Sequence, residues 1–153
     1  MLKSHSMHHS EELAELLCAN LSDMYALFLK TQNYHWNIKG TNCLPVHEFL
    51  GKWYDQQLEM IDLIAERISS LGHHVPANFA YFSQHQKISD PLEKATEQEM
   101  LTDLLGGQED LVNRALRISL TLTQKKNDDV TADILIECMR AYEKNNWFIR
   151  NML

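Results

Sequence analysis

Apolar residues recur at three- and four-residue steps along most of the chain, which is the spacing of one face of an α-helix. A first stripe begins after Ser10, a residue suited to cap a helix start, and leads to His35. Gly40 then ends this predicted helix, because glycine readily adopts the left-handed conformation that follows a last helical turn. His35 is therefore predicted to face inward. The stripe consists of Leu13, Leu17, Leu21, Met24, Phe28 and Thr31.

The same periodicity predicts three further helices. They cover residues 45–71, 91 to about 125, and 129 to about 148. Asp90 and Pro91 mark the expected start of the third, as an N-cap followed by a first-turn proline. Inside that helix, Gly106 and Gly107 lower the helix propensity by roughly 2 kcal/mol relative to alanine. They predict either a kink or close packing against another helix.

Residues 73–90 contain Pro76, several aromatic residues and few periodic apolar positions, which predicts a long connection holding one short helix. Strand signals are nearly absent. Four amphipathic helices with one long connection between the second and third predict an all-α four-helix bundle with ferritin-like connectivity. Residues 1–9 lack the pattern and are predicted to be a flexible tail. Residues 10–153 would then form one domain, with enough apolar residues for a core.

Composition narrows the classes of function. The net charge of −7, from 21 acidic and 14 basic residues, argues against a general nucleic-acid binder and suits the attraction of cations. The odd number of cysteines (Cys18, Cys43 and Cys138) fits neither a disulfide framework nor a zinc knuckle and indicates reduced thiols. With no long apolar run and no signal-like N-terminus, we expect a cytoplasmic protein without a membrane span.

Two histidines and two acids gather between residues 35 and 66. Asp62 and Glu66 are four residues apart and share one face of the predicted second helix. With His35 and His47 they form a set that suits a divalent transition metal, iron and zinc being the leading candidates. The chain contains no Glu-x-x-His pair, so the usual ferritin centre inside the bundle is not expected.

These four groups cannot meet within one chain. His47 and Asp62 are fifteen residues apart, roughly 22 Å along a helix axis. If two copies of the second helix pack antiparallel about a twofold axis near Tyr54 and Asp55, His47 of one copy lies level with Asp62 of the other. The sequence therefore predicts either a site between subunits or no site at all.

Three segments in this region, YHWNIKGTN, VHEFL and DLIAERISSLG, resemble the signature of the Dps family of dodecameric mini-ferritins. Further segments, LFLKTQNYHWNIKG, DDVTADIL and YEKNNWFIR, extend the resemblance over nearly all of residues 10–150. It implies a hollow homododecamer that binds Fe(II) across subunit twofold axes, oxidises it preferentially with hydrogen peroxide and stores ferric mineral. His35, His47, Asp62 and Glu66 would be the ferroxidase ligands.

One position at this site departs from the family. The family usually has an aspartate four residues after the second histidine, and this chain has Gly51. The departure should weaken a second iron position, because such carboxylates tune metal sites. Asp55, one turn further on, could substitute through a water. The alternative function is a shell that sequesters metal with impaired oxidase activity. Beside His35, Trp36 could act as a radical sink or serve only in packing.

The resemblance also implies roles at the fourth helix and at the N-terminus. Asp128, Asp129 and Asp133 match an acidic run that lines iron-entry pores in the family, although one of the first two could simply cap the helix. Many Dps proteins condense DNA through lysine-rich tails. Because this chain has only Lys3 before the first helix, we expect no strong DNA binding at neutral pH.

Overall fold

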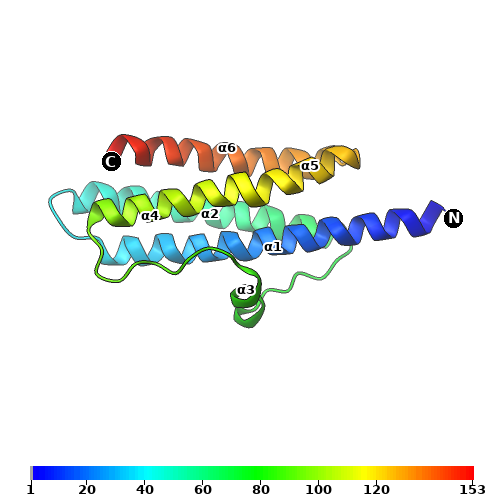
Figure 1. Cartoon of the computed structure of the whole chain (residues 1–153), viewed down its shortest axis with the longest axis horizontal. Helices are drawn as coiled ribbons and strands as arrows, with labels where there is room; N and C mark the ends of the chain where they lie inside the picture. Colours follow the sequence, from blue (N-terminus) through cyan, green and yellow to red (C-terminus); the bar gives the residue numbers. More distant parts are fainter. Residues whose placement is uncertain (1) are drawn as a thin grey trace.

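The computed structural model describes the backbone of residues 2–153 and the side chains of residues 11–153. Four long helical segments form a bundle, and a short helix lies outside it in the connection between the second and third segments (Figure 1). No strand occurs among the described residues. The predicted all-α ferritin-like bundle is therefore confirmed. Its elements are α1 (Leu2–Asn37), α2 (Cys43–Ser70), α3 (Phe79–His85), α4 (Glu97–Asp110), the π-helix η1 (Leu111–Leu116), α5 (Arg117–Lys125) and α6 (Asp129–Met152).

The first helix begins earlier than predicted. α1 starts at Leu2, so Ser10 lies inside the helix and does not cap it. The periodicity of residues 1–9 is too weak to reveal this from the sequence. The side chains of residues 1–10 lie outside the described part of the chain, and the division into a 1–9 tail and a 10–153 domain stays a prediction.

The third long segment begins later than predicted. α4 starts at Glu97, because Thr96 and Glu99 form a capping box in which each side chain accepts a hydrogen bond from the other residue's backbone N–H. Asp90 and Pro91 lie in the preceding connection. The capping box satisfies two backbone N–H groups at once, and this stabilises a helix start at Thr96 more than the first-turn Pro91 stabilises a start at Asp90.

The adjacent glycines bring α4 close to α1. A Cβ added to Gly107 would lie 2.9 Å from Cδ2 of Leu27, whereas one added to Gly106 would meet nothing within 4 Å. The predicted close packing is therefore confirmed at Gly107. The irregular turn comes four residues later, in η1.

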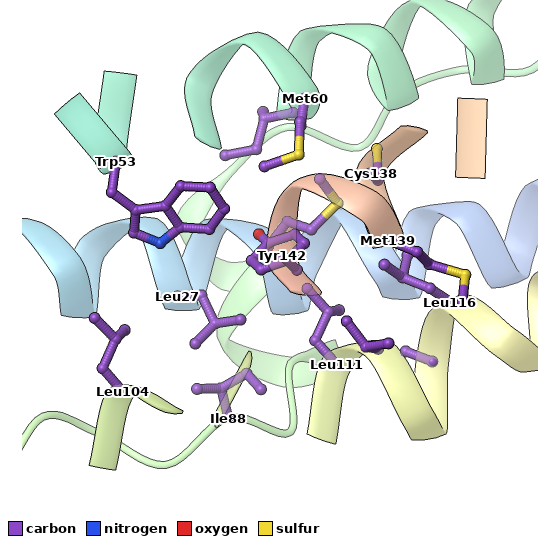
Figure 2. Close-up of a cluster of buried hydrophobic side chains, with 14 of the residues drawn as sticks. Leu27, Trp53, Met60, Ile88, Leu104, Leu111, Leu116, Cys138, Met139 and Tyr142 are labelled. Carbon is purple, nitrogen blue, oxygen red and sulfur yellow. The ribbon is translucent and has the colours of Figure 1, made fainter. Parts of the chain in front are cut away.

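The core runs between the four segments and fixes which face of α2 points outward (Figure 2). Trp53 of α2 packs edge-to-face on Tyr142 of α6, with ring centroids 5.1 Å apart and planes at 85°. Leu27 and Leu104 are fully buried between α1 and α4. With Trp53 and its apolar neighbours turned inward, Asp62 and Glu66 are left exposed on α2.

A buried polar network ties the long connection to the bundle. Lys30 is fully buried, and its Nζ donates to Asp103 Oδ2 at 2.7 Å and to Ser89 Oγ at 3.1 Å. The Tyr34 hydroxyl also donates to Asp103, and it accepts from the backbone N–H of Leu92 at 2.9 Å. The connection therefore runs over α1 along a fixed path.

Two further predictions concern reduced cysteine thiols and the absence of a membrane-spanning helix. Cys18 and Cys138 are buried, Cys43 is half-buried, and all three are free thiols. Burial raises the pKa of the Cys138 thiol to about 12, which keeps it protonated and unreactive. Among the described residues, none of the helices is both long enough and apolar enough to cross a membrane.

Candidate metal centre

His35 and His47 lie face to face where α1 ends and α2 begins. Their ring centroids are 3.6 Å apart and the planes differ by 20°. Gly40, at φ 123°, reverses the chain between the two helices. The sequence predicts that His35 faces inward, and the structure places its ring against the ring of His47 in α2.

Each histidine binds the backbone of the other. His35 Nδ1 donates to the His47 carbonyl oxygen at 2.8 Å, and His47 Nδ1 donates to the His35 carbonyl oxygen at 2.8 Å. The His35 carbonyl belongs to the last turn of α1, where helix carbonyls lack a partner within the helix. The His47 side chain therefore caps α1, and the two rings hold the two helices in register.

These bonds determine which ring nitrogens can bind a metal. A carbonyl oxygen only accepts, so Nδ1 carries the proton in both neutral rings. The lone pair of each ring is then on Nε2, the atom left for a metal. Fixing the tautomer through the second nitrogen in this way is the usual support for a histidine ligand.

The near-parallel stacking limits how one ion can use the pair. A lone pair lies in the plane of its own ring, and a metal bond to imidazole nitrogen is about 2.0–2.1 Å long. Two near-parallel planes with centroids 3.6 Å apart cannot both contain one ion at that distance. In this arrangement, His35 and His47 each offer one nitrogen to a different ion position.

Gly51 and Tyr54 complete the surroundings of His35. A Cβ added to Gly51 would lie 3.2 Å from His35 Cε1 and 3.5 Å from its Nδ1. The Tyr54 ring meets the same imidazole edge-on, with centroids 5.2 Å apart. The His35 ring therefore fills the space beside α2 that a side chain at position 51 would take.

Asp62 and Glu66 do not reach the histidine pair within one chain. Both acids are exposed on α2, one turn apart, and α2 is continuous from Cys43 to Ser70. No group of three or more His, Cys, Asp or Glu side chains that could hold a metal occurs among the described residues of this single chain. The chain supplies two separate halves, an imidazole pair and a carboxylate pair.

The acidic run at the start of α6 divides into one paired and two exposed residues. Asp128 caps α6 by accepting from the Thr131 backbone N–H at 3.0 Å, and it forms an ion pair with Arg67 at 3.0 Å. Burial raises the pKa of Asp128, but the Thr131 hydrogen bonds and the Arg67 charge outweigh it and leave that pKa below its ordinary value. Asp129 and Asp133 are exposed. The predicted helix cap is thus Asp128.

Comparison with known proteins agrees with this fold. The ferritin-like domain family matches residues 14–153. Antigen TpF1 of Treponema pallidum is 32% identical over 139 residues, covering 90% of this chain and 77% of that protein. The crystal structure of TpF1 superposes with a TM-score of 0.91 at 30% identity, covering 95% of this chain and 94% of that one.

The crystal structure of a Dps protein from Bacillus brevis superposes with a TM-score of 0.90 at 26% identity, covering 95% of this chain and 97% of that one. The chain belongs to the Dps family of ferritin-like proteins. Of the seven residues predicted to bind metal or line a pore, this Dps chain brings together only His35 and His47. Asp62, Glu66, Asp129 and Asp133 lie apart and exposed, and Asp128 caps α6.

Two features of the centre were missed from the sequence. The mutual hydrogen bonds of His35 and His47 depend on the register of two helices, for which a twelve-residue spacing gives no signal. The fit of Gly51 against His35 was also missed, although a glycine inside a strongly periodic helix is a known sign of close approach.

Proposed function

We propose that this Dps protein oxidises Fe(II) and stores the ferric product inside a homododecameric shell. Each site would combine His35 and His47 of one subunit with Asp62 and Glu66 of its twofold neighbour. The observation that carries the proposal is the division of ligands along α2. An imidazole pair with free Nε2 atoms lies near one end, and an exposed carboxylate pair lies toward the other. An antiparallel pair of α2 helices would bring the halves together.

The ligand types fit iron as the substrate. Neutral imidazoles suit Fe(II), and carboxylates hold Fe(III). Hydrogen peroxide is the proposed oxidant: two Fe(II) each give one electron, the O–O bond breaks, and two hydroxide ions form. Taking both electrons at one centre avoids the release of hydroxyl radical. The near-parallel imidazoles fit this chemistry, because they serve two ion positions.

The proposal is tested by adding Fe(II) under anaerobic conditions, then hydrogen peroxide, and following the absorbance of ferric oxo species. We expect oxidation faster than in buffer, with about two Fe(II) consumed per peroxide. The double variant Asp62→Asn, Glu66→Gln should lose this rate, and Glu59→Gln, an exposed acid of the same helix, should keep it. A mass near twelve subunits in size-exclusion chromatography tests the shell. A rate equal to that of buffer rejects the ferroxidase.

A second candidate is a shell that sequesters divalent ions without efficient oxidation. Gly51 favours it, since the position next to His47 lacks a carboxylate from its own subunit. The same experiment separates the two candidates. A sequestering shell would bind Fe(II) with the stoichiometry of its sites and show no acceleration on addition of peroxide.

Iron entry is proposed to use the acids at the start of α6. Asp129 and Asp133 are exposed and would focus cations at a pore between subunits, while Arg67 offsets the charge of Asp128. Asp133→Asn should slow iron uptake into the shell, with Glu137→Gln as the exposed control on the same helix. An unchanged uptake rate would remove Asp133 from the pathway.

The proposed location is the cytoplasm, and DNA is not a proposed partner at neutral pH. The net charge of −7 per chain repels the DNA backbone. Relatives carry the name DNA protection during starvation protein, among them one from Brevibacillus brevis that is 28% identical over 141 residues. A gel shift at pH 7.5 in moderate salt should show no complex for this chain, and a shifted band there would contradict the proposal.

A further inference from the structure

Gly51 occupies a position where glycine is needed for space and not for backbone freedom. It lies in the middle of α2 with ordinary helical geometry, and glycine inside a helix is less favourable than alanine. Its hydrogen faces the His35 ring: a Cβ there would stand 3.2 Å from Cε1 and 3.5 Å from Nδ1. An ordinary side chain would crowd the ring.

The His35 ring has little freedom to move away. Its Nδ1 is bound to the His47 carbonyl at 2.8 Å, its face lies 3.6 Å from the His47 ring, and its edge meets Tyr54. A side chain at position 51 would therefore stretch the Nδ1 bond or open the stack. Either change moves the His35 ring and with it the Nε2 lone pair.

We propose that Gly51 is a positioning residue for the metal centre: the absence of a side chain there lets His35 stack on His47 and sets the direction of the His35 Nε2 lone pair. The inference rests on the proposed function, since it assigns that nitrogen to the metal. Gly51 thus not only lacks the carboxylate of an aspartate but also gives the His35 ring its space. An aspartate at position 51 would supply a carboxylate and at the same time displace His35, so the substitution exchanges one geometry for another.

The chain offers a matched control. Gly106 also lies inside a helix, and a Cβ there meets nothing within 4 Å. Gly51→Ala adds a methyl group and no metal ligand, so it tests positioning separately from ligation. Gly106→Ala adds the same group in open space.

The first measurement is Co(II) binding to the assembled protein, followed by its visible absorption spectrum. We expect Gly51→Ala to shift the spectrum and to weaken binding of the first Co(II) by roughly 10- to 100-fold, the range found when the supports of a metal ligand are altered. Gly106→Ala should change neither. Gly51→Asp should show a shifted first-site spectrum as well. Two tight Co(II) ions with an unchanged first spectrum in Gly51→Asp would overturn the proposal, as would an unchanged spectrum and affinity in Gly51→Ala.

The second measurement needs no metal, so it separates this proposal from the proposed function. Gly106→Ala should raise the melting temperature of the metal-free protein, and Gly51→Ala should raise it less or lower it. In a protein that already carries His35→Ala, Gly51→Ala should raise the melting temperature as much as Gly106→Ala does, because the His35 imidazole is no longer there to be crowded. If Gly51→Ala fails to assemble, His35→Ala must restore assembly. Equal gains with and without His35, or failure to assemble in both backgrounds, overturn the positioning role.

Discussion

His35 and His47 donate to each other's backbone carbonyl oxygens, at 2.8 Å in both directions. The pair thus serves two purposes at once. It closes the last turn of α1 onto α2, and it leaves Nε2 of both rings free for a metal. The two purposes use different nitrogens of the same ring, so they can be separated by mutation.

His47→Asn should separate them. The asparagine amide nitrogen stands close to where Nδ1 stood and can still cap α1, whereas nothing replaces Nε2. We expect stability within about 0.5 kcal/mol of the wild type together with loss of metal binding at that position, while His47→Ala also loses about 1 kcal/mol for the missing hydrogen bond. Thermal unfolding and Fe(II) titration on the same samples check this. An Fe(II) stoichiometry in His47→Asn equal to that of the wild type would contradict the role of the His47 Nε2.

Asp128 should stabilise the protein in a pH-dependent way. A carboxyl whose pKa is lowered in the folded state stabilises fully above its ordinary pKa, and this contribution is lost as the pH falls through the folded value. Asp128→Ala should cost about 0.5–2 kcal/mol at pH 7, the range for a lost N-cap. The difference from wild type should shrink below about pH 4. Glu137→Ala is the exposed control, and a difference that grows toward low pH would refute the assignment.

Substitution by alanine should lower the stability of the protein at Gly107 and raise it at Gly106. At Gly107 the new Cβ meets buried Leu27 at 2.9 Å, and overpacking of this kind costs about 1–3 kcal/mol, more than the helix propensity returns. At Gly106 the propensity gain of up to about 1 kcal/mol is unopposed. Melting temperatures of the two variants at matched protein concentration decide the matter. Gains of equal size at both positions would mean that α1 and α4 are not in close contact there.

Replacing Lys30 by alanine should cost far more stability than replacing a surface lysine. Its buried Nζ is paired with Asp103, and removing one partner of such a pair costs roughly 3–5 kcal/mol. Lys30→Ala should therefore lower the melting temperature strongly and expose residues 86–96 to proteolysis. Lys125→Ala, at an exposed position, should stay within about 0.5 kcal/mol of wild type. Equal proteolysis of the two variants would show that the network does not hold the connection.

The fold was largely predictable because hydrophobic periodicity decides helices, and one long gap in that periodicity decides the crossover. The residues at which the helices begin were less predictable. Asp90–Pro91 and Thr96–Glu99 both have the residue types of a helix start, and only the reciprocal capping bonds at the second favour it. The fully buried Lys30 is likewise invisible in the sequence, since its partner Asp103 comes 73 residues later.

The sequence suggests the residue types of a candidate site, and this assignment stays a prediction, whereas the geometry of the histidine pair cannot be read from the sequence. Helix arithmetic already separates His47 from Asp62, and the structure keeps these halves apart within one chain. The stacking of His35 on His47 depends on the α1–α2 register and on the space at Gly51. Sequence periodicity gives neither, because both arise from contacts between helices.

The central claim, a site shared between subunits, is tested most directly by mixing inactive subunits. One variant carries His35→Ala with His47→Ala, and the other carries Asp62→Ala with Glu66→Ala. In shells assembled from equal amounts, random twofold pairing should restore about a quarter of the sites, each with histidines from one chain and acids from the other. We predict that fraction of wild-type Fe(II) binding in the mixture and none in either variant alone. Mixed shells that bind no more Fe(II) than the separate variants would contradict the account.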